Sequence, residues 1–490
     1  MPKNDDLTGP SIFTTLTLKR GQARGLSEQL RQQIEQAIID RRLPPGARLP
    51  SCRDLAAQLG VARGTVRASY DMLVDRQFLQ TRGAAGTFVN PLPMLSETAG
   101  SQAKVQAGVH AVPLSLREGE ENDDSPPLTF QMGIPASDSF PAKVWLRILQ
   151  RQTRALVGKP ASYPDPRGTP ALRQALVAWL AVARGVRCHA DQIFITNGYA
   201  GAMGLIGLAM DFQGKQAWLE DPGFMVARRA IETLQVRPVA VPVDAEGLQV
   251  EEGLARAPDA AFALVTPGQQ APLGVTMSPA RRHALLNWAS RQQRWIIEDD
   301  YLGELQPGHR AAPALAALDS EGRVLHIGTF SKSLTPRLRL GFLVAPPALV
   351  SRFADVSALL APASSGLLHD AVAVFLREGH FMRHLRRMKR VYHERLEQMM
   401  AALQPHFPAV QRAGLSVIVR LPAGTPDRLI AQQALAYGMA PSPLSIWYQR
   451  DEQRCAGLLL GAAQLPRDGY ARSAARLKAL VDAHIVRLSC

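Results

Sequence analysis

Near the N-terminus, apolar side chains recur every three or four residues. Leu26, Leu30, Ile34 and Ile38 fall on one stripe, so residues 26–41 are predicted to form an amphipathic helix. The Pro-Pro-Gly turn that follows Leu43 stops this helix.

The same helical pattern appears twice more, at about residues 52–59 and at residues 61–76, and Ser51 is placed to cap the first of these helices. Two short strand patterns then flank a glycine-rich turn, at residues 78–80 and 87–89. Three helices followed by a small hairpin predict a winged helix-turn-helix domain, to which we assign residues 20–90.

Residues 91–127 have weak periodicity and many Pro, Ser, Gly and acidic residues, so we interpret them as a flexible linker. The stretch from Glu118 to Asp124 is strongly acidic and would repel DNA. The linker is therefore not expected to be a DNA-contacting arm.

From residue 128 to residue 490, short apolar runs alternate with helical stretches. The runs lie at residues 192–196, 217–220, 261–265, 294–297 and 324–327. This alternation predicts an α/β domain with a mostly parallel sheet.

Charge and cysteine content narrow the classes of function. The 490 residues, with a net charge of +14, are too many for one ordinary core. Residues 1–90 hold 13 Lys or Arg and 8 Asp or Glu, which makes them more than twice as basic per residue as the rest and favours an anionic partner there. Four scattered cysteines and a polar N-terminus predict no disulfide framework, no metal site and a cytoplasmic protein, associated with the nucleoid when bound to DNA.

The helix-turn-helix pattern identifies candidate DNA contacts. The third helix of such a domain enters the major groove by its N-terminal end, which here contains Arg63, Thr65 and Arg67. Arg53 would lie near the DNA backbone, and Arg82 with the wing tip that ends at Gly86 would approach the minor groove. The alternatives are a solvated basic face or a protein-protein module.

A second cluster of motifs points to a cofactor. Lys332 lies in the run Gly328–Leu334, and Arg339 follows it closely. Asp299 and Tyr301 come directly after the apolar run at residues 294–297. Pyridoxal 5′-phosphate needs an amine for its aldehyde, an acid for its ring nitrogen and a cation for its phosphate, and this set supplies all three.

Residues 43–66 and 86–89 closely resemble the GntR-type winged-helix family, and residues 128–490 resemble the fold-type I aminotransferases, which implies a mostly parallel sheet followed by a smaller C-terminal α+β subdomain. Together the chain resembles the MocR-type regulators, which implies a DNA operator, a small-molecule effector and a homodimer. The resemblance assigns Lys332 to the internal aldimine, Asp299 to the pyridinium nitrogen and Tyr301 to the phenolate oxygen of the cofactor. It assigns phosphate or ring contacts to the following further residues: Arg339, Thr329, Ser331, Gly198, Tyr199, Phe224 and, from the neighbouring subunit, Tyr163.

Two positions depart from the aminotransferase pattern. Ala271 stands where true aminotransferases carry an asparagine, and the strand at residues 456–461 lacks the arginine that grips a substrate carboxylate, although Arg454 precedes it. We therefore expect a transcriptional regulator that senses pyridoxal 5′-phosphate or an amine that reacts with it. A working aminotransferase with an appended domain, and a DNA binder whose large domain only dimerises, are the alternatives.

Overall fold

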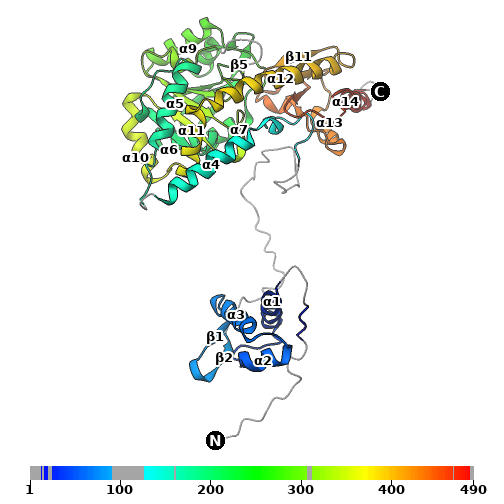
Figure 1. Ribbon diagram of the computed structural model, residues 1–490. Coiled ribbons are helices and arrows are strands. Elements are labelled where there is room, and N and C mark those ends of the chain that lie inside the picture. The colour runs from blue at the N-terminus through cyan, green and yellow to red at the C-terminus, as the bar shows by residue number, and fades with distance from the viewer. Residues whose placement is uncertain are drawn as a thin grey trace. The chain divides into compact units, whose positions relative to one another are not determined.

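The computed structural model describes residues 13, 16–19, 25–90, 126–158, 162–305, 312–466 and 468–485. Contacts divide the chain into two compact units, residues 1–112 and 113–490 (Figure 1). Residues 91–125 of the predicted linker lie outside the described residues.

The N-terminal unit is a three-helix domain with a small hairpin. Its helices are α1 (Leu26–Ile39), α2 (Cys52–Leu59) and α3 (Arg63–Asp75). Leu30, Leu55 and Val66, one from each helix, are fully buried together. The third helix begins two residues later than predicted, because Val61 and Ala62 belong to the turn: Ala62 is extended and the Val61 N–H donates to the Ala56 carbonyl oxygen.

The wing is the antiparallel pair of β1 (Leu79–Thr81) and β2 (Thr87–Val89), in which Leu79 faces Val89. Gly86, with φ of 109°, closes the turn between them, a conformation that side chains other than glycine rarely adopt.

A sheet of eight strands, in the order β3-β10-β9-β8-β7-β4-β5-β6, organises the larger unit. The strands are β3 (Ile193–Thr196), β4 (Gln216–Asp221), β5 (Arg237–Asp244), β6 (Gly247–Leu248), β7 (Phe262–Val265), β8 (Trp295–Asp300), β9 (Val324–Thr329) and β10 (Gly341–Val344). The five strands from β9 to β5 in that order run parallel, and β10 and β6 are antiparallel to their neighbours. The predicted α/β class with a mostly parallel sheet is confirmed.

Helices cover both faces of this sheet because its strands bury side chains on both sides. In β3, Ile193 and Ile195 pack with α4, α5 and α11, whereas Phe194 packs with α6 and α10 on the other face. The helices of the sheet layers are α4 (Ala142–Val157), α5 (Pro170–Ala183), α6 (Gly198–Ala209), α7 (Met225–Thr233), α8 (Val250–Arg256), α9 (Pro279–Arg291), α10 (Val350–Leu359) and α11 (Gly366–Arg377).

The long helix α12 (His380–Leu403) leads from these layers to a smaller C-terminal part (Figure 1). There α12 packs with α13 (Asp427–Ala434) and α14 (Ala471–Ile485) on an antiparallel sheet in the order β11-β12-β14-β13. Its strands are β11 (Val410–Ala413), β12 (Ser416–Arg420), β13 (Ser442–Pro443) and β14 (Gly457–Gly461). The predicted C-terminal α+β part is confirmed, and its predicted strand is β14.

Across the described parts of the chain, no helix is both long and apolar enough to cross a membrane.

Candidate cofactor and DNA-binding sites

Lys332 lies in the turn that follows β9. Its Nζ donates a hydrogen bond to the Gly133 carbonyl oxygen, and a Cβ added to Gly133 would lie 3.4 Å from that Nζ. Burial lowers the pKa of Lys332, while the negative charge of Asp299 opposes this shift. A lysine with a lowered pKa is an unprotonated amine more often than a surface lysine is, so it is a better nucleophile.

Asp299 presents a buried carboxylate to the same region. Its Oδ1 is buried without a hydrogen-bond partner among the described residues. Burial, together with the charges of Asp300 and Glu220, raises the pKa of Asp299 to about 8. A buried carboxylate oxygen without a partner is costly, and a protonated ring nitrogen is a group that would satisfy it. The side chain therefore fits the pyridinium end of the cofactor.

The two acidic neighbours of Asp299 already have hydrogen-bond partners within the chain. Asp300 accepts two hydrogen bonds from Arg184, at 2.6 and 3.0 Å. Glu298 contacts Nδ1 of the buried His326 at 2.9 Å and accepts two backbone N–H groups. Alternation along β8 places these two carboxylates on one face and Asp299 on the other, so the geometry selects Asp299 from the acidic run.

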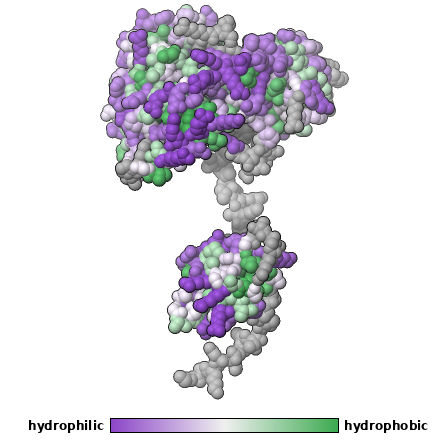
Figure 2. Space-filling view, viewed as in Figure 1, coloured by the Kyte–Doolittle hydropathy of each residue, from purple (hydrophilic) through white to green (hydrophobic). Residues whose placement is uncertain are grey.

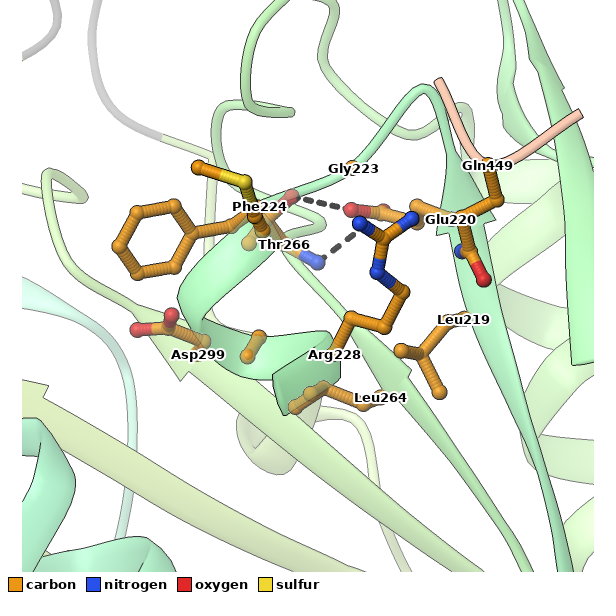
Figure 3. Close-up of a pocket in the computed structure, with 11 residues that line it drawn as sticks. Leu219, Glu220, Gly223, Phe224, Arg228, Leu264, Thr266, Asp299 and Gln449 are labelled. Atoms are coloured by element: carbon orange, nitrogen blue, oxygen red, sulfur yellow. Dashed lines mark hydrogen bonds between the residues drawn. The ribbon is translucent and has the colours of Figure 1, made fainter. Parts of the chain in front are cut away.

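Glu220, at the end of β4, is a buried carboxylate that the sequence analysis did not identify. It accepts hydrogen bonds from Thr266 N at 3.1 Å and from Thr266 Oγ1 at 2.6 Å, which Figure 3 shows as dashed lines. Burial raises the pKa of Glu220 to about 7. The pocket drawn in Figure 3 brings Glu220 and Asp299 together with Phe224 and Arg228.

Phe224 directly precedes α7 and is 38% exposed. Its ring centroid lies 6.2 Å from that of Tyr199 and 6.1 Å from that of Trp447. The Tyr199 hydroxyl is buried without a partner among the described residues. An aromatic face bordered by an unpaired hydroxyl and the free oxygen of Asp299 suits a planar, polar ring.

The phosphate candidates gather where β3 leads into α6. The Arg339 Nη2 donates to the Asn197 carbonyl oxygen at 3.4 Å, and its Cζ lies 4.0 Å from where a Cβ on Gly198 would be. Thr329 and Ser331 are joined at 3.0 Å between their hydroxyl oxygens. The N-terminus of a 12-residue helix beside an exposed arginine favours a phosphate group.

Three further predicted positions lie in surroundings of different kinds. The Tyr163 side chain is fully exposed, so within one chain it approaches none of these groups closely. Arg454 forms an ion pair with Asp451 in a turn before β14. Tyr301, by contrast, is partly buried beside Asp299, with its hydroxyl near Gln269, and burial raises its pKa.

In the N-terminal unit, Arg53, Arg63 and Arg67 are all exposed, while Thr65 is partly buried. Arg67 is 3.8 Å from Asp71 in an exposed pair, which contributes little to stability and is readily replaced by a phosphate. In the wing, the Arg82 guanidinium lies over the Phe88 ring at 4.9 Å. Arg48, which the sequence analysis missed, lies against Gly86, 3.2 Å from the position of an added Cβ.

Comparison with known proteins gives matches to both units. Residues 26–89 match the bacterial regulatory proteins of the gntR family, and residues 130–439 match the class I and II aminotransferases. The probable rhizopine catabolism regulatory protein MocR of Rhizobium meliloti is 34% identical over 88% of each chain. The pyridoxine biosynthesis regulator PdxR of Corynebacterium glutamicum is 30% identical over 78% of this chain and 79% of its own.

Among solved structures, an archaeal alanine:glyoxylate aminotransferase superposes with a TM-score of 0.67 at 25% identity, over 74% of this chain and 92% of its own. The α-aminoadipate aminotransferase LysN of Thermus thermophilus, complexed with N-(5′-phosphopyridoxyl)-L-leucine, gives 0.66 at 28% identity, over 74% and 93%.

Proposed function

The chain belongs to the MocR-type regulators of the gntR family, and from this premise we propose that it senses pyridoxal 5′-phosphate, or an amine that reacts with it, at Lys332. Residues 20–90 read the operator, residues 91–127 are the linker, and residues 128–490 are the sensor. One observation carries the proposal: a lysine of lowered pKa, a buried carboxylate with a free oxygen and an arginine at a helix N-terminus share one site on a chain with a winged helix.

Each end of the site holds one part of the cofactor. When bound, pyridoxal 5′-phosphate supplies an aldehyde that condenses reversibly with amines. Asp299 pairs with the ring nitrogen and keeps its proton there, Phe224 covers the ring, and Tyr301 donates to the ring oxygen. Arg339, the N–H groups of Gly198 and Tyr199, and the hydroxyls of Thr329 and Ser331 hold the phosphate.

The buried face of α12 connects this site to the rest of the sensor. His384 contacts the carbonyl oxygen of Ser333 at 2.7 Å, one residue after Lys332. The Tyr392 hydroxyl accepts the Ala136 N–H at 3.1 Å, in the same loop as Gly133. The free amine of Lys332 donates to Gly133, whereas an amine bonded to the cofactor would leave that contact until an incoming amine set it free again, and both ends of the contact are tied to α12. The two states of the lysine thus differ in contacts along one helix, as a ligand-driven switch requires.

A homodimer completes the site. The exposed apolar side chains Leu156, Val157, Leu359 and Leu360 belong to the ends of α4 and α10, and the hydroxyl of Ser357 donates to Pro166 O at 2.9 Å, close to the exposed Tyr163. Such a surface suits a second copy of this chain, in which Tyr163 reaches the phosphate of the partner subunit. Light scattering of the purified protein tests whether its mass is that of a dimer.

The alternative of a working aminotransferase finds no support in β14, whose five residues are Gly-Leu-Leu-Leu-Gly. That strand has no cationic side chain, so it offers no group to bind a substrate carboxylate as the arginine of aminotransferases does.

Selection of DNA fragments with the full-length protein, followed by affinity measurements with and without pyridoxal 5′-phosphate, tests the function. We expect an enriched sequence whose affinity changes with the cofactor in wild type and in Lys215→Ala, an exposed-lysine control, but not in Lys332→Ala. No enriched sequence, or the same cofactor effect in Lys332→Ala, would contradict the proposal.

A further inference from the structure

Two helical segments of the sensor combine four or five cations each with no acidic residue. They are α4, at residues 142–157, and the first part of α12, at residues 380–393. Between them they carry nine cations, which we call the basic face: Lys143, Arg147, Arg151, Arg154, Arg383, Arg386, Arg387, Lys389 and Arg390. The net charge of the chain outside residues 1–90 is +9, which equals the charge of these nine cations. The remaining charges outside residues 1–90 therefore cancel.

The α12 part of the basic face points to solvent. Arg383, Arg386, Arg387 and Arg390 are exposed at helical spacing on one side, while the opposite side of the helix is buried. Arg386, Arg387 and Arg390 form no ion pair with any residue that the structure describes. Leaving three neighbouring arginines unpaired costs repulsion between like charges, and an anionic partner would remove that repulsion.

The α4 and α12 parts form one continuous surface. Arg151 Nη2 and Glu378 Oε1 are 2.6 Å apart, and Arg383 Nη2 donates to the Glu378 carbonyl oxygen at 3.0 Å. Glu378 thus lies between the two rows of cations and joins them. Figure 2 shows predominantly hydrophilic side chains over this face of the larger unit, where Figure 1 places α4 and α12.

We propose that the basic face is a second DNA contact, which holds the phosphates of DNA flanking the operator without reading its sequence. This inference rests on the proposed function. Eight helical residues, such as Arg383–Arg390, span about 10 Å, which is enough to reach neighbouring phosphates of one strand. Seven of the nine cations are arginines, which can bind phosphate oxygens in pairs.

A DNA partner is favoured over other anions by the rest of the chain. The winged helix tethers DNA to the same molecule, so a weak, non-specific surface is occupied at high effective concentration. Neutralising phosphates releases counterions, so each contact adds about 0.9 to the slope of log affinity against log salt concentration.

The test compares two triple variants of the full-length protein with equal charge change. Arg386→Ala, Arg387→Ala and Arg390→Ala remove the centre of the basic face. Arg187→Ala, Arg291→Ala and Arg428→Ala remove three exposed arginines elsewhere on the same unit. Affinities are measured against salt, on a short duplex with the operator alone and on a long duplex with flanking DNA.

We expect the basic-face triple to reduce the salt slope on the long duplex by roughly 2 to 3, with little change on the short one and an unchanged cofactor absorbance band. The control triple should match wild type on both. If the basic-face triple keeps the wild-type slope on the long duplex, the surface contacts a different partner and the inference is wrong. Failure of the proposed function would look different, because wild type itself would then show no sequence preference on the short duplex.

Discussion

The substitution Asp299→Asn should stabilise the larger unit against unfolding when no cofactor is bound. With pyridoxal 5′-phosphate present, the variant should be less stable than wild type and should bind the cofactor more weakly. In the cofactor-free protein, Asp299 is a buried acid whose pKa is raised to about 8, chiefly by burial. The unfolded chain ionises this group near pH 4, whereas the folded chain keeps it protonated. The folded state therefore loses stability as the pH rises from about 4 to about 8, and the loss is complete above that range.

The size of the effect follows from the shift. One pKa unit corresponds to about 1.4 kcal/mol, so a shift of about four units sets an upper bound of about 5 kcal/mol on the loss at pH 8. Asparagine has the same shape and no charge to bury. At pH 8 the empty variant should thus be more stable than wild type by a few kcal/mol, and at pH 4 the two should be equal.

With pyridoxal 5′-phosphate bound, the order should reverse. The ring nitrogen then pairs with the carboxylate, so wild type gains stability that the Asp299→Asn variant cannot match, and the variant should bind the cofactor more weakly.

Urea unfolding followed by tryptophan fluorescence measures these differences on the correct unit. All six tryptophans, from Trp145 to Trp447, lie in the larger unit, so the winged helix is silent in this assay. Unfolding curves of both proteins at pH 4 and pH 8, with and without cofactor, give the full comparison. If the empty Asp299→Asn variant is no more stable than wild type at pH 8, the argument from the buried charge is refuted.

Both sites also give predictions for single substitutions. Arg339→Ala should weaken cofactor binding by about 10- to 150-fold, because each charge-assisted hydrogen bond contributes about 1.5–3 kcal/mol; equilibrium dialysis checks this, and an unchanged dissociation constant would place the phosphate elsewhere. His384→Ala should alter the pH dependence of the visible absorbance of the bound cofactor, because the Lys332 turn loses its anchor; His384→Gln, which keeps a donor, should restore the wild-type profile, and equal profiles in all three proteins would exclude this positioning role. Arg63→Ala or Arg67→Ala should cost about 1–3 kcal/mol on the specific site and relax base preference if the residue reads a guanine. If that residue only holds phosphate, the loss should be uniform across sequences and the salt slope should fall by about one unit.

The sequence predicted the winged helix well because its signals are local: a capping serine, a glycine turn and helical stripes. In the larger sheet it missed β5, where Pro238 and Pro242 interrupt the strand pattern, the two-residue β6, and β10.

The phosphate end of the site depends on one of those missed strands. Gly341 pairs with Thr196 between β10 and β3, and this long-range pairing brings Arg339 next to Gly198. No local pattern encodes that contact. Glu220, Arg184 and His384 escaped notice for a similar reason, since a single polar residue in an apolar run shows its role only once its partner is known.

Borohydride reduction of the protein with pyridoxal 5′-phosphate, followed by peptide mapping, tests the central claim most directly. The chain has nine lysines, and we predict that the reduced cofactor is found on Lys332 alone, with the visible absorbance band lost on reduction and absent from Lys332→Ala. A label on another lysine, or one spread evenly over several lysines, would contradict the account.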